Sequence, residues 1–104
     1  MSEELERKLK DAVWIAHSLF ERGKTSGSSA NLSFLHDGKI YISASGTCFG
    51  TLTADDFAVV SMSGERLNSL KPSKELTLHR YYYEHNESVQ AVIHTHGPYA
   101  VLWS

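Results

Sequence analysis

The sequence lacks several features that would define whole classes of protein. Cys48 is its single cysteine, so an intramolecular disulfide and a cysteine-cluster metal site are both excluded. No apolar run approaches the roughly 20 residues that cross a bilayer, and the charged start MSEELERKLK does not have the apolar segment of a signal peptide. The formal net charge of −2 argues against a nucleic-acid binder held by bulk charge. We therefore expect a cytoplasmic protein with no membrane and no nucleic-acid partner.

What remains is the composition of a single globular domain over residues 1–104. Hydrophobic residues make up 41% of the chain and charged residues 21%, which is typical of a folded protein with a core. Histidine is unusually frequent, with six in 104 residues, and two of the six lie in His94-Thr95-His96.

Local patterns predict an α/β arrangement. Apolar residues at three- and four-residue intervals indicate a helix over 2–22, and Asp37-Gly38 is typical of a hairpin turn. Pro72 indicates the start of a second helix over 73–85, and Pro98 the start of a third over 99–103. The expected strands are 32–36, 39–43, 57–62 and 89–95, with one helical turn at 54–56 capped by Thr53.

The two histidines of the 94–96 segment are candidate metal ligands. Residues two apart on a strand point to the same face, so both imidazoles could hold one zinc ion. The alternative is that they are strand-end histidines with ordinary hydrogen bonds. A catalytic zinc normally has three protein ligands, and the histidines that could complete the site are His17, His36, His79 and His85.

Glu75 is the remaining candidate for chemistry. It lies four residues before His79, so both would share one helix face, and we expect one of the two to face the site. Near a metal, Glu75 could serve as ligand or base; the alternative is a helix-start glutamate favoured by the helix dipole.

Three loops of small residues could bind an anion: 27–31, 43–47 and 72–74. Small residues let backbone N–H groups approach a phosphate, and Lys74 would add a point charge. Each loop alone is more often a simple turn. No P-loop or dinucleotide motif is present, so a nucleotide site has little support.

Four segments in order resemble the class II aldolase/adducin family. They are GSSANLS (27–33), IYISASGTCFG (40–50), KPSKE (71–75) and AVIHTHGPYAV (91–101), and the segments 2–22 and LTADDFAVV (52–60) also fit. The resemblance implies an α/β/α layered fold with a largely antiparallel central sheet, of which this chain holds the N-terminal half.

The resemblance also implies a function, a metal-dependent lyase. Its substrate is a phosphorylated ketose or 3-oxo sugar acid, which it cleaves or decarboxylates through an enediolate. Family members bind zinc or another divalent metal through three histidines and form homo-oligomers, typically tetramers. By this resemblance Glu75 is the acid/base and a metal ligand. The other implied residues are the metal ligands His94 and His96, and the phosphate-site residues Asn31, Ser45, Gly46, Ser73 and Lys74.

The chain departs from the family pattern in two ways. Ala30 stands where the family usually has glycine, and the chain ends before the third metal histidine. The alternatives are therefore a catalytically incomplete remnant and an adducin-like interaction domain without catalysis. Retention of Glu75, His94 and His96 counts against the interaction domain. The PSKE and GTCFG segments look closer to the 3-oxo-tetronate 4-phosphate decarboxylase branch than to the fuculose-phosphate aldolases.

Overall fold

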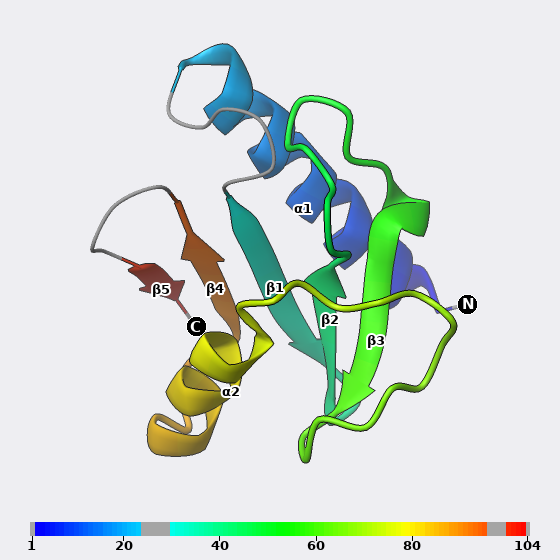
Figure 1. Ribbon diagram of the computed structural model, residues 1–104, viewed down its shortest axis with the longest axis vertical. Helices are drawn as coiled ribbons and strands as arrows, with labels where there is room; N and C mark the ends of the chain where they lie inside the picture. Colours follow the sequence, from blue (N-terminus) through cyan, green and yellow to red (C-terminus); the bar gives the residue numbers. More distant parts are fainter. Residues whose placement is uncertain (1, 24–29, 96–99, 104) are drawn as a thin grey trace.

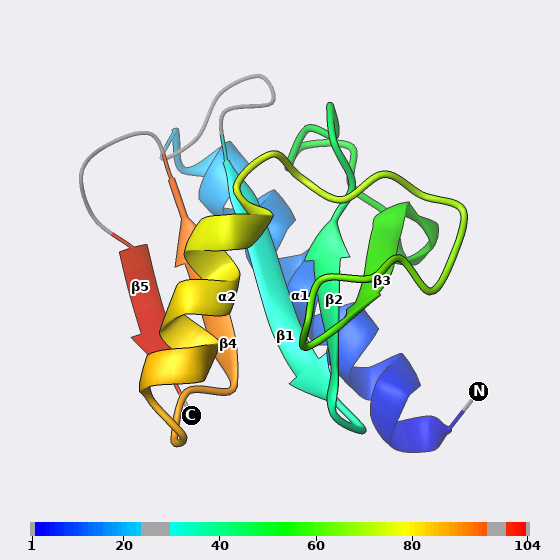
Figure 2. The same cartoon turned by 60° about the horizontal axis from the view of Figure 1, so that its bottom comes forward.

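A five-stranded sheet with one helix on each face forms the structure, a computed structural model that describes residues 2–23, 30–95 and 100–103 (Figures 1 and 2). The strand order is β3-β2-β1-β4-β5, and every neighbouring pair is antiparallel. Helix α1 (Glu3–Glu21) covers one face and helix α2 (Leu76–His85) the other. The predicted α/β layering around a largely antiparallel sheet is confirmed. No helix in the described ranges is both long and apolar enough to span a membrane.

Local sequence signals account for α1. The Ser2 side chain caps the helix by accepting a hydrogen bond from the backbone N–H of Leu5 at 3.1 Å. Three glutamates lie in the first turn, where the helix dipole favours negative charge. The helix ends before Gly23, whose positive φ of 71° favours glycine. Its buried face contributes Leu9, Ala12 and Ala16 to the core.

The first two strands form the predicted hairpin. Strand β1 (Asn31–His36) and strand β2 (Lys39–Ser43) are joined by Asp37 and Gly38, which both have positive φ. Such a turn matches the twist of the flanking strands. The η1 turn (Ala54–Asp56) has a capping box from Thr53 and leads into strand β3 (Phe57–Ser61).

The alternation of side chains along the strands produces two core layers. The layer under α1 includes Leu32 and Phe34 of β1, whereas the layer under α2 includes Ile40, Val92 and Tyr83. Strand β4 (Ala91–His94) follows the same alternation. Asn31, Ser33 and His94 therefore lie on the α2 face.

Over residues 2–95 the helices and strands match the expected ones with small shifts at their ends, except that the second helix starts three residues later than expected. The predicted helix over 73–85 begins at Leu76, because Pro72 forms a β-bridge with Ala44 and the Ser73 N–H donates to the Ser43 carbonyl at 3.1 Å. These extended pairings hold residues 72 and 73 out of helical geometry.

The expected C-terminal helix over 99–103 is wrong. Residues Ala100–Trp103 form strand β5, which pairs with β4 in the register Ala91 to Trp103 and His94 to Ala100. The open edge of β4 satisfies the backbone groups of this segment, whereas one helical turn would leave most of them unpaired. Residues 96–99 lie outside the described ranges.

Candidate functional site

Residues from three separate segments meet near the start of β1. The Ser45 N–H donates to the Lys71 carbonyl at 2.8 Å, which joins the loop after β2 to the segment before α2. The hydroxyl of Ser43, the last residue of β2, accepts a hydrogen bond from the Leu32 N–H at 3.1 Å, which fixes the start of this loop beside β1. Figure 2 shows the first turn of α2 at the end of the sheet where β1 begins and β4 ends.

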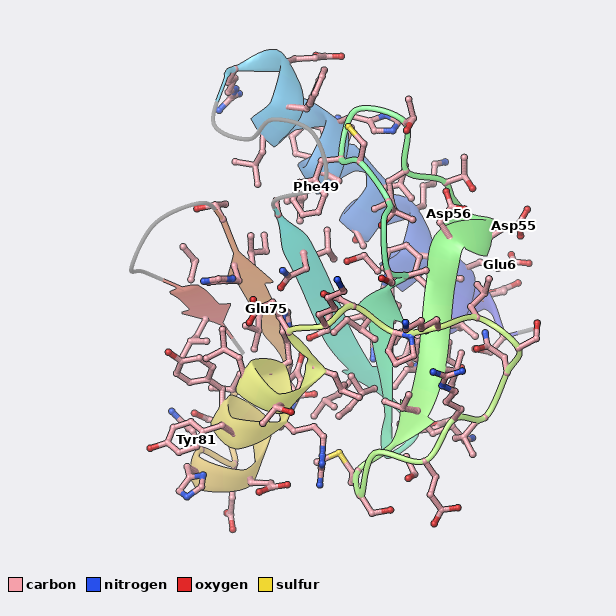
Figure 3. The ribbon with its side chains drawn as sticks, in the orientation of Figure 1. Glu6, Phe49, Asp55, Asp56, Glu75 and Tyr81 are labelled. Atoms are coloured by element: carbon pink, nitrogen blue, oxygen red, sulfur yellow. The ribbon has the colours of Figure 1, made fainter. Side chains whose placement is uncertain are left out.

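The segment before α2 presents the polar residues Ser73, Lys74 and Glu75. The Ser73 hydroxyl accepts from the Glu75 N–H at 3.2 Å, which orders the approach to the helix. Glu75 occupies the N-cap position with its side chain exposed and without a capping hydrogen bond (Figure 3). Its carboxylate is therefore free to act on a ligand at the positive end of the helix dipole.

The loop after β2 makes a tight turn at Ser45 and Gly46. The Thr47 hydroxyl donates to the Ala44 carbonyl at 2.7 Å, and Gly46 has a φ of +82°. Residues with a side chain rarely adopt this backbone conformation, so the turn favours glycine at position 46.

Position 30, where this chain has alanine and the family usually has glycine, does not have a positive φ. It is buried, and Asp37 is the only non-glycine residue with positive φ in the described part of the chain. Alanine therefore fits the backbone at position 30 without strain.

Asn31 and His94 are cross-strand partners. They face each other in the β1–β4 register, and both lie on the α2 side of the sheet. The Cα atoms of such partners are about 5 Å apart. The pairing brings the first residue of β1 beside the last residue of β4.

His79 is the buried centre of a polar cluster behind Asn31. Its Nε2 lies 2.5 Å from Asn31 Oδ1, and its Nδ1 lies 2.6 Å from Ser33 Oγ. Ser33 Oγ lies a further 2.6 Å from the Tyr83 hydroxyl. Ser33 and His79 are completely buried, and Asn31 and Tyr83 are nearly so. Four polar side chains thus form one continuous chain between β1 and α2.

The electrostatics of this cluster keep it uncharged. Burial, together with a smaller repulsion from His94, lowers the pKa of His79 from 6.5 to about 3. Burial also raises the pKa of Tyr83 above its usual value, against a smaller opposing effect of its hydrogen bond with Ser33. At neutral pH His79 is a neutral imidazole with one donor nitrogen and one acceptor nitrogen.

The other candidate histidines lie elsewhere. His36 is at the opposite end of β1 from Asn31, about 16 Å away by strand rise. His17 Nε2 lies 2.8 Å from the Leu52 carbonyl oxygen, and His85 is exposed at the C-terminal end of α2. His79 is the only one of the four beside His94.

The fit of these residues to a metal ion rests on His94. Its Nδ1 is buried and has no hydrogen-bond partner in the described part of the chain, so it is available to a cation or a donor. His96, its expected partner, lies outside the described residues. Within the described ranges, no three histidine, cysteine or acidic side chains are grouped closely enough to hold a metal ion. By donor type alone, the His94 imidazole and the Glu75 carboxylate are ligands that zinc accepts.

Sequence reasoning missed the roles of Ser33 and Tyr83. The available signal was polar residues at positions 31 and 33, which share one face of β1. A second signal was the four-residue spacing of His79 and Tyr83, which places both on one face of α2.

Comparison with known proteins identifies the fold. A family model for the class II aldolase and adducin N-terminal domain matches residues 10–104. The crystal structure of YgbL, a candidate aldolase/epimerase/decarboxylase from Klebsiella pneumoniae, superposes with a TM-score of 0.85 at 40% identity. That match covers 90% of this chain and 46% of YgbL. An L-fuculose 1-phosphate aldolase structure shows the same fold, with a TM-score of 0.80 at 24% identity, covering 94% of this chain and 46% of that one.

Curated relatives point to the same class. The chain is 37% identical over 100 residues to 3-oxo-tetronate 4-phosphate decarboxylase from Pectobacterium atrosepticum, covering 95% of this chain and 46% of that protein. It is 35% identical over 96 residues to L-fuculose phosphate aldolase from Methanococcus vannielii, covering 92% and 52%. These similarities define a protein with the class II aldolase fold. The chain belongs to the class II aldolase and adducin family, and it spans about half the length of the curated relatives it matches.

Proposed function

We propose that this chain provides the phosphate site, the acid/base and part of the metal site of a lyase that acts on a phosphorylated ketose or 3-oxo sugar acid. The observation that carries the proposal is the meeting of three segments at one end of the sheet. Asn31 pairs with His94 in the register, and Ser45 is hydrogen-bonded to the segment that leads to Glu75.

The phosphate group would be held by the two loops and by Asn31. Ser45, Gly46, Ser73 and Lys74 are partly or fully exposed near the start of α2, and Lys74 supplies the positive charge. Backbone N–H groups in such loops and at a helix start favour a bound anion. These residues would hold the substrate by its phosphate group, which is not part of the bond that breaks.

Glu75 is the proposed acid/base. Both candidate reactions break a carbon–carbon bond next to a carbonyl group, and both leave a carbanion that must gain a proton. The exposed carboxylate of Glu75, with no capping hydrogen bond to hold it, can carry that proton. We therefore assign the same role to Glu75 in aldol cleavage and in decarboxylation.

A divalent metal, zinc by donor chemistry, would be held by His94, by His96 and, without substrate, by Glu75. When bound it would polarise the substrate carbonyl and stabilise the negative charge that develops during cleavage. A third histidine would come from residues outside this chain or from a neighbouring subunit. A ligand from a neighbouring subunit would require a homo-oligomer, with the family tetramer as the expected assembly.

The test measures metal and product together. The purified chain is loaded with zinc, and bound zinc is counted by elemental analysis for wild type, His94→Ala and the control His85→Ala. The variant at position 94 should lose zinc, because it removes a ligand, whereas His85 is exposed at the far end of α2. Equal zinc in all three proteins would contradict the metal assignment.

Activity is measured with 3-oxo-tetronate 4-phosphate and L-fuculose 1-phosphate. Decarboxylation of the first and aldol cleavage of the second both release dihydroxyacetone phosphate, and only the first releases carbon dioxide. Glu75→Gln should lower kcat by about 100-fold or more, while Glu87→Gln, an exposed carboxylate outside α2, should not. Zinc binding without turnover of either substrate would support the alternative of a catalytically incomplete chain.

A further inference from the structure

The side chains of Tyr83, Ser33, His79 and Asn31 form a buried polar chain beneath the site, and of the four only Asn31 has a role in the function proposed above. All four side chains are at least about nine-tenths buried, and consecutive members lie 2.5–2.6 Å apart. Each buried polar group needs a partner, so the hydrogen bonds along this chain must run in one consistent direction.

The direction can be worked out from the Tyr83 end. In the described part of the chain, the Tyr83 hydroxyl has one partner, Ser33 Oγ. If Tyr83 only accepted, its own proton would be buried without a partner, which is costly. Tyr83 therefore donates to Ser33, and the Ser33 proton is directed to Nδ1 of His79.

The next hydrogen bond, from His79 to Asn31, follows the same direction. A neutral imidazole that accepts at Nδ1 carries its proton on Nε2, and Nε2 lies beside Asn31 Oδ1. The Asn31 oxygen is thus used as the acceptor, and both N–H donors of its amide remain for another partner. Within the described residues nothing accepts a hydrogen bond from that nitrogen.

We propose that His79 is a positioning residue that holds the Asn31 amide oxygen inward, so that the head of β1 offers two N–H donors to a ligand oxyanion. With the reverse orientation, the amide oxygen would face the ligand and repel its negative oxygens. Tyr83 and Ser33 act through His79 by fixing its tautomer. The identity of the oxyanion as a phosphate rests on the proposed function, whereas the orientation of Asn31 does not.

The first test reads the tautomer directly. Long-range proton–nitrogen NMR on the nitrogen-15-labelled chain at pH 7.5 distinguishes a protonated Nε2 from a protonated Nδ1, and His79→Gln assigns the signals. We expect the proton on Nε2. A proton on Nδ1 would overturn the proposal, whether or not the protein is a lyase.

The second test uses inorganic phosphate as the probe. Phosphate should shift the side-chain amide resonances of Asn31, whereas sodium chloride at the same ionic strength should not. Asn31→Asp keeps an acceptor for His79 but has no donors, so it should lose phosphate binding and retain the Nε2 proton. No shift at Asn31 with wild type, or undiminished binding by Asn31→Asp, would refute the donor role.

The third test separates positioning from structure. Ser33→Ala removes the donor to Nδ1, so a mixture of tautomers should appear and phosphate should bind roughly 3- to 10-fold more weakly at an unchanged circular dichroism spectrum. Tyr83→Phe is the milder variant if Ser33→Ala does not fold, and it should change the tautomer in the same direction. A changed tautomer with unchanged phosphate affinity would overturn the proposal. Lyase activity in a protein with the proton on Nδ1 would support the proposed function and contradict the positioning role. A proton on Nε2 with phosphate binding but no lyase activity would support the positioning role and contradict the proposed function.

Discussion

Acidification should destabilise this protein through His79 in particular. The side chain is completely buried, and burial, with a smaller contribution from His94, lowers its pKa from 6.5 to about 3. An unfolded chain regains the ordinary pKa. Between these two values the unfolded state binds one more proton than the folded state, so stability is fully present above pH 6.5 and is lost as the pH falls toward 3.

The size of the effect follows from the two pKa values. Each pH unit in that window removes about 1.4 kcal/mol from the free energy of unfolding, so lowering the pH from 8 to 5 removes about 2 kcal/mol through this one residue. That is a large share of the 5–15 kcal/mol typical of a folded domain.

The assay is urea unfolding of wild type and His79→Gln at pH 8, 7, 6 and 5. The variant loses some stability at every pH, but it lacks the titrating imidazole, so the difference between the two proteins should shrink by about 2 kcal/mol between pH 8 and 5. His85→Gln, an exposed change on the same helix, serves as the matched control. If wild type and His79→Gln lose stability in parallel, the reasoning about His79 is refuted.

Three further predictions concern stability and are checked by thermal or urea unfolding. Gly46→Ala should cost about 1–2 kcal/mol because the φ of +82° disfavours a side chain although no atom crowds the position; an unchanged melting temperature would show that the turn can relax. Ser2→Ala should cost about 1 kcal/mol by removing the cap of α1, whereas Ser2→Asp should restore it, and equal stability of the two variants would contradict the capping role. Phe49→Ala should cost about 3–5 kcal/mol because its side chain is 1% exposed in the core under α1; a loss below about 1 kcal/mol would mean that the core closes over the gap.

The parts of the fold that sequence predicted are those with local causes. The spacing of apolar residues and the Ser2 cap determine α1, and Asp37-Gly38 with its two positive φ values determines the hairpin. The capping box at Thr53 was likewise a short-range signal. Each of these features depends on residues within four positions of one another.

The errors came from segments whose structure depends on distant partners. Residues 100–103 form a strand because the open edge of β4 supplies backbone partners, which no pattern within the segment reveals. The start of α2 is delayed because Pro72 pairs with Ala44, 28 positions earlier in the chain. A proline at a helix start is a sound local signal, but here the pairing across the chain decided the boundary.

The candidate site likewise combines features with local causes and features that depend on distant partners. Sequence patterns supplied His94, Glu75 and the loop of Asn31 as candidates and the resemblance assigned their roles; whether these residues carry the proposed roles stays a prediction. The link from Asn31 to His79 spans 48 positions and arises only when α2 packs across β1. The polar residues at positions 31 and 33 were a signal that the sequence analysis did not use, and their partner on α2 could not be read from the sequence.

The burial that destabilises the protein in acid also gives the proposed site a single hydrogen-bond arrangement at neutral pH. With a pKa of about 3, His79 carries a second proton in roughly one molecule in ten thousand at pH 7. A surface histidine would exchange protons and tautomers freely, and an asparagine beside it would turn with each exchange. Inside the core, Tyr83 and Ser33 leave His79 a single consistent arrangement, so Asn31 presents the same donors in nearly every molecule. Loss of stability in acid and constancy of the ligand site are therefore two consequences of one buried imidazole.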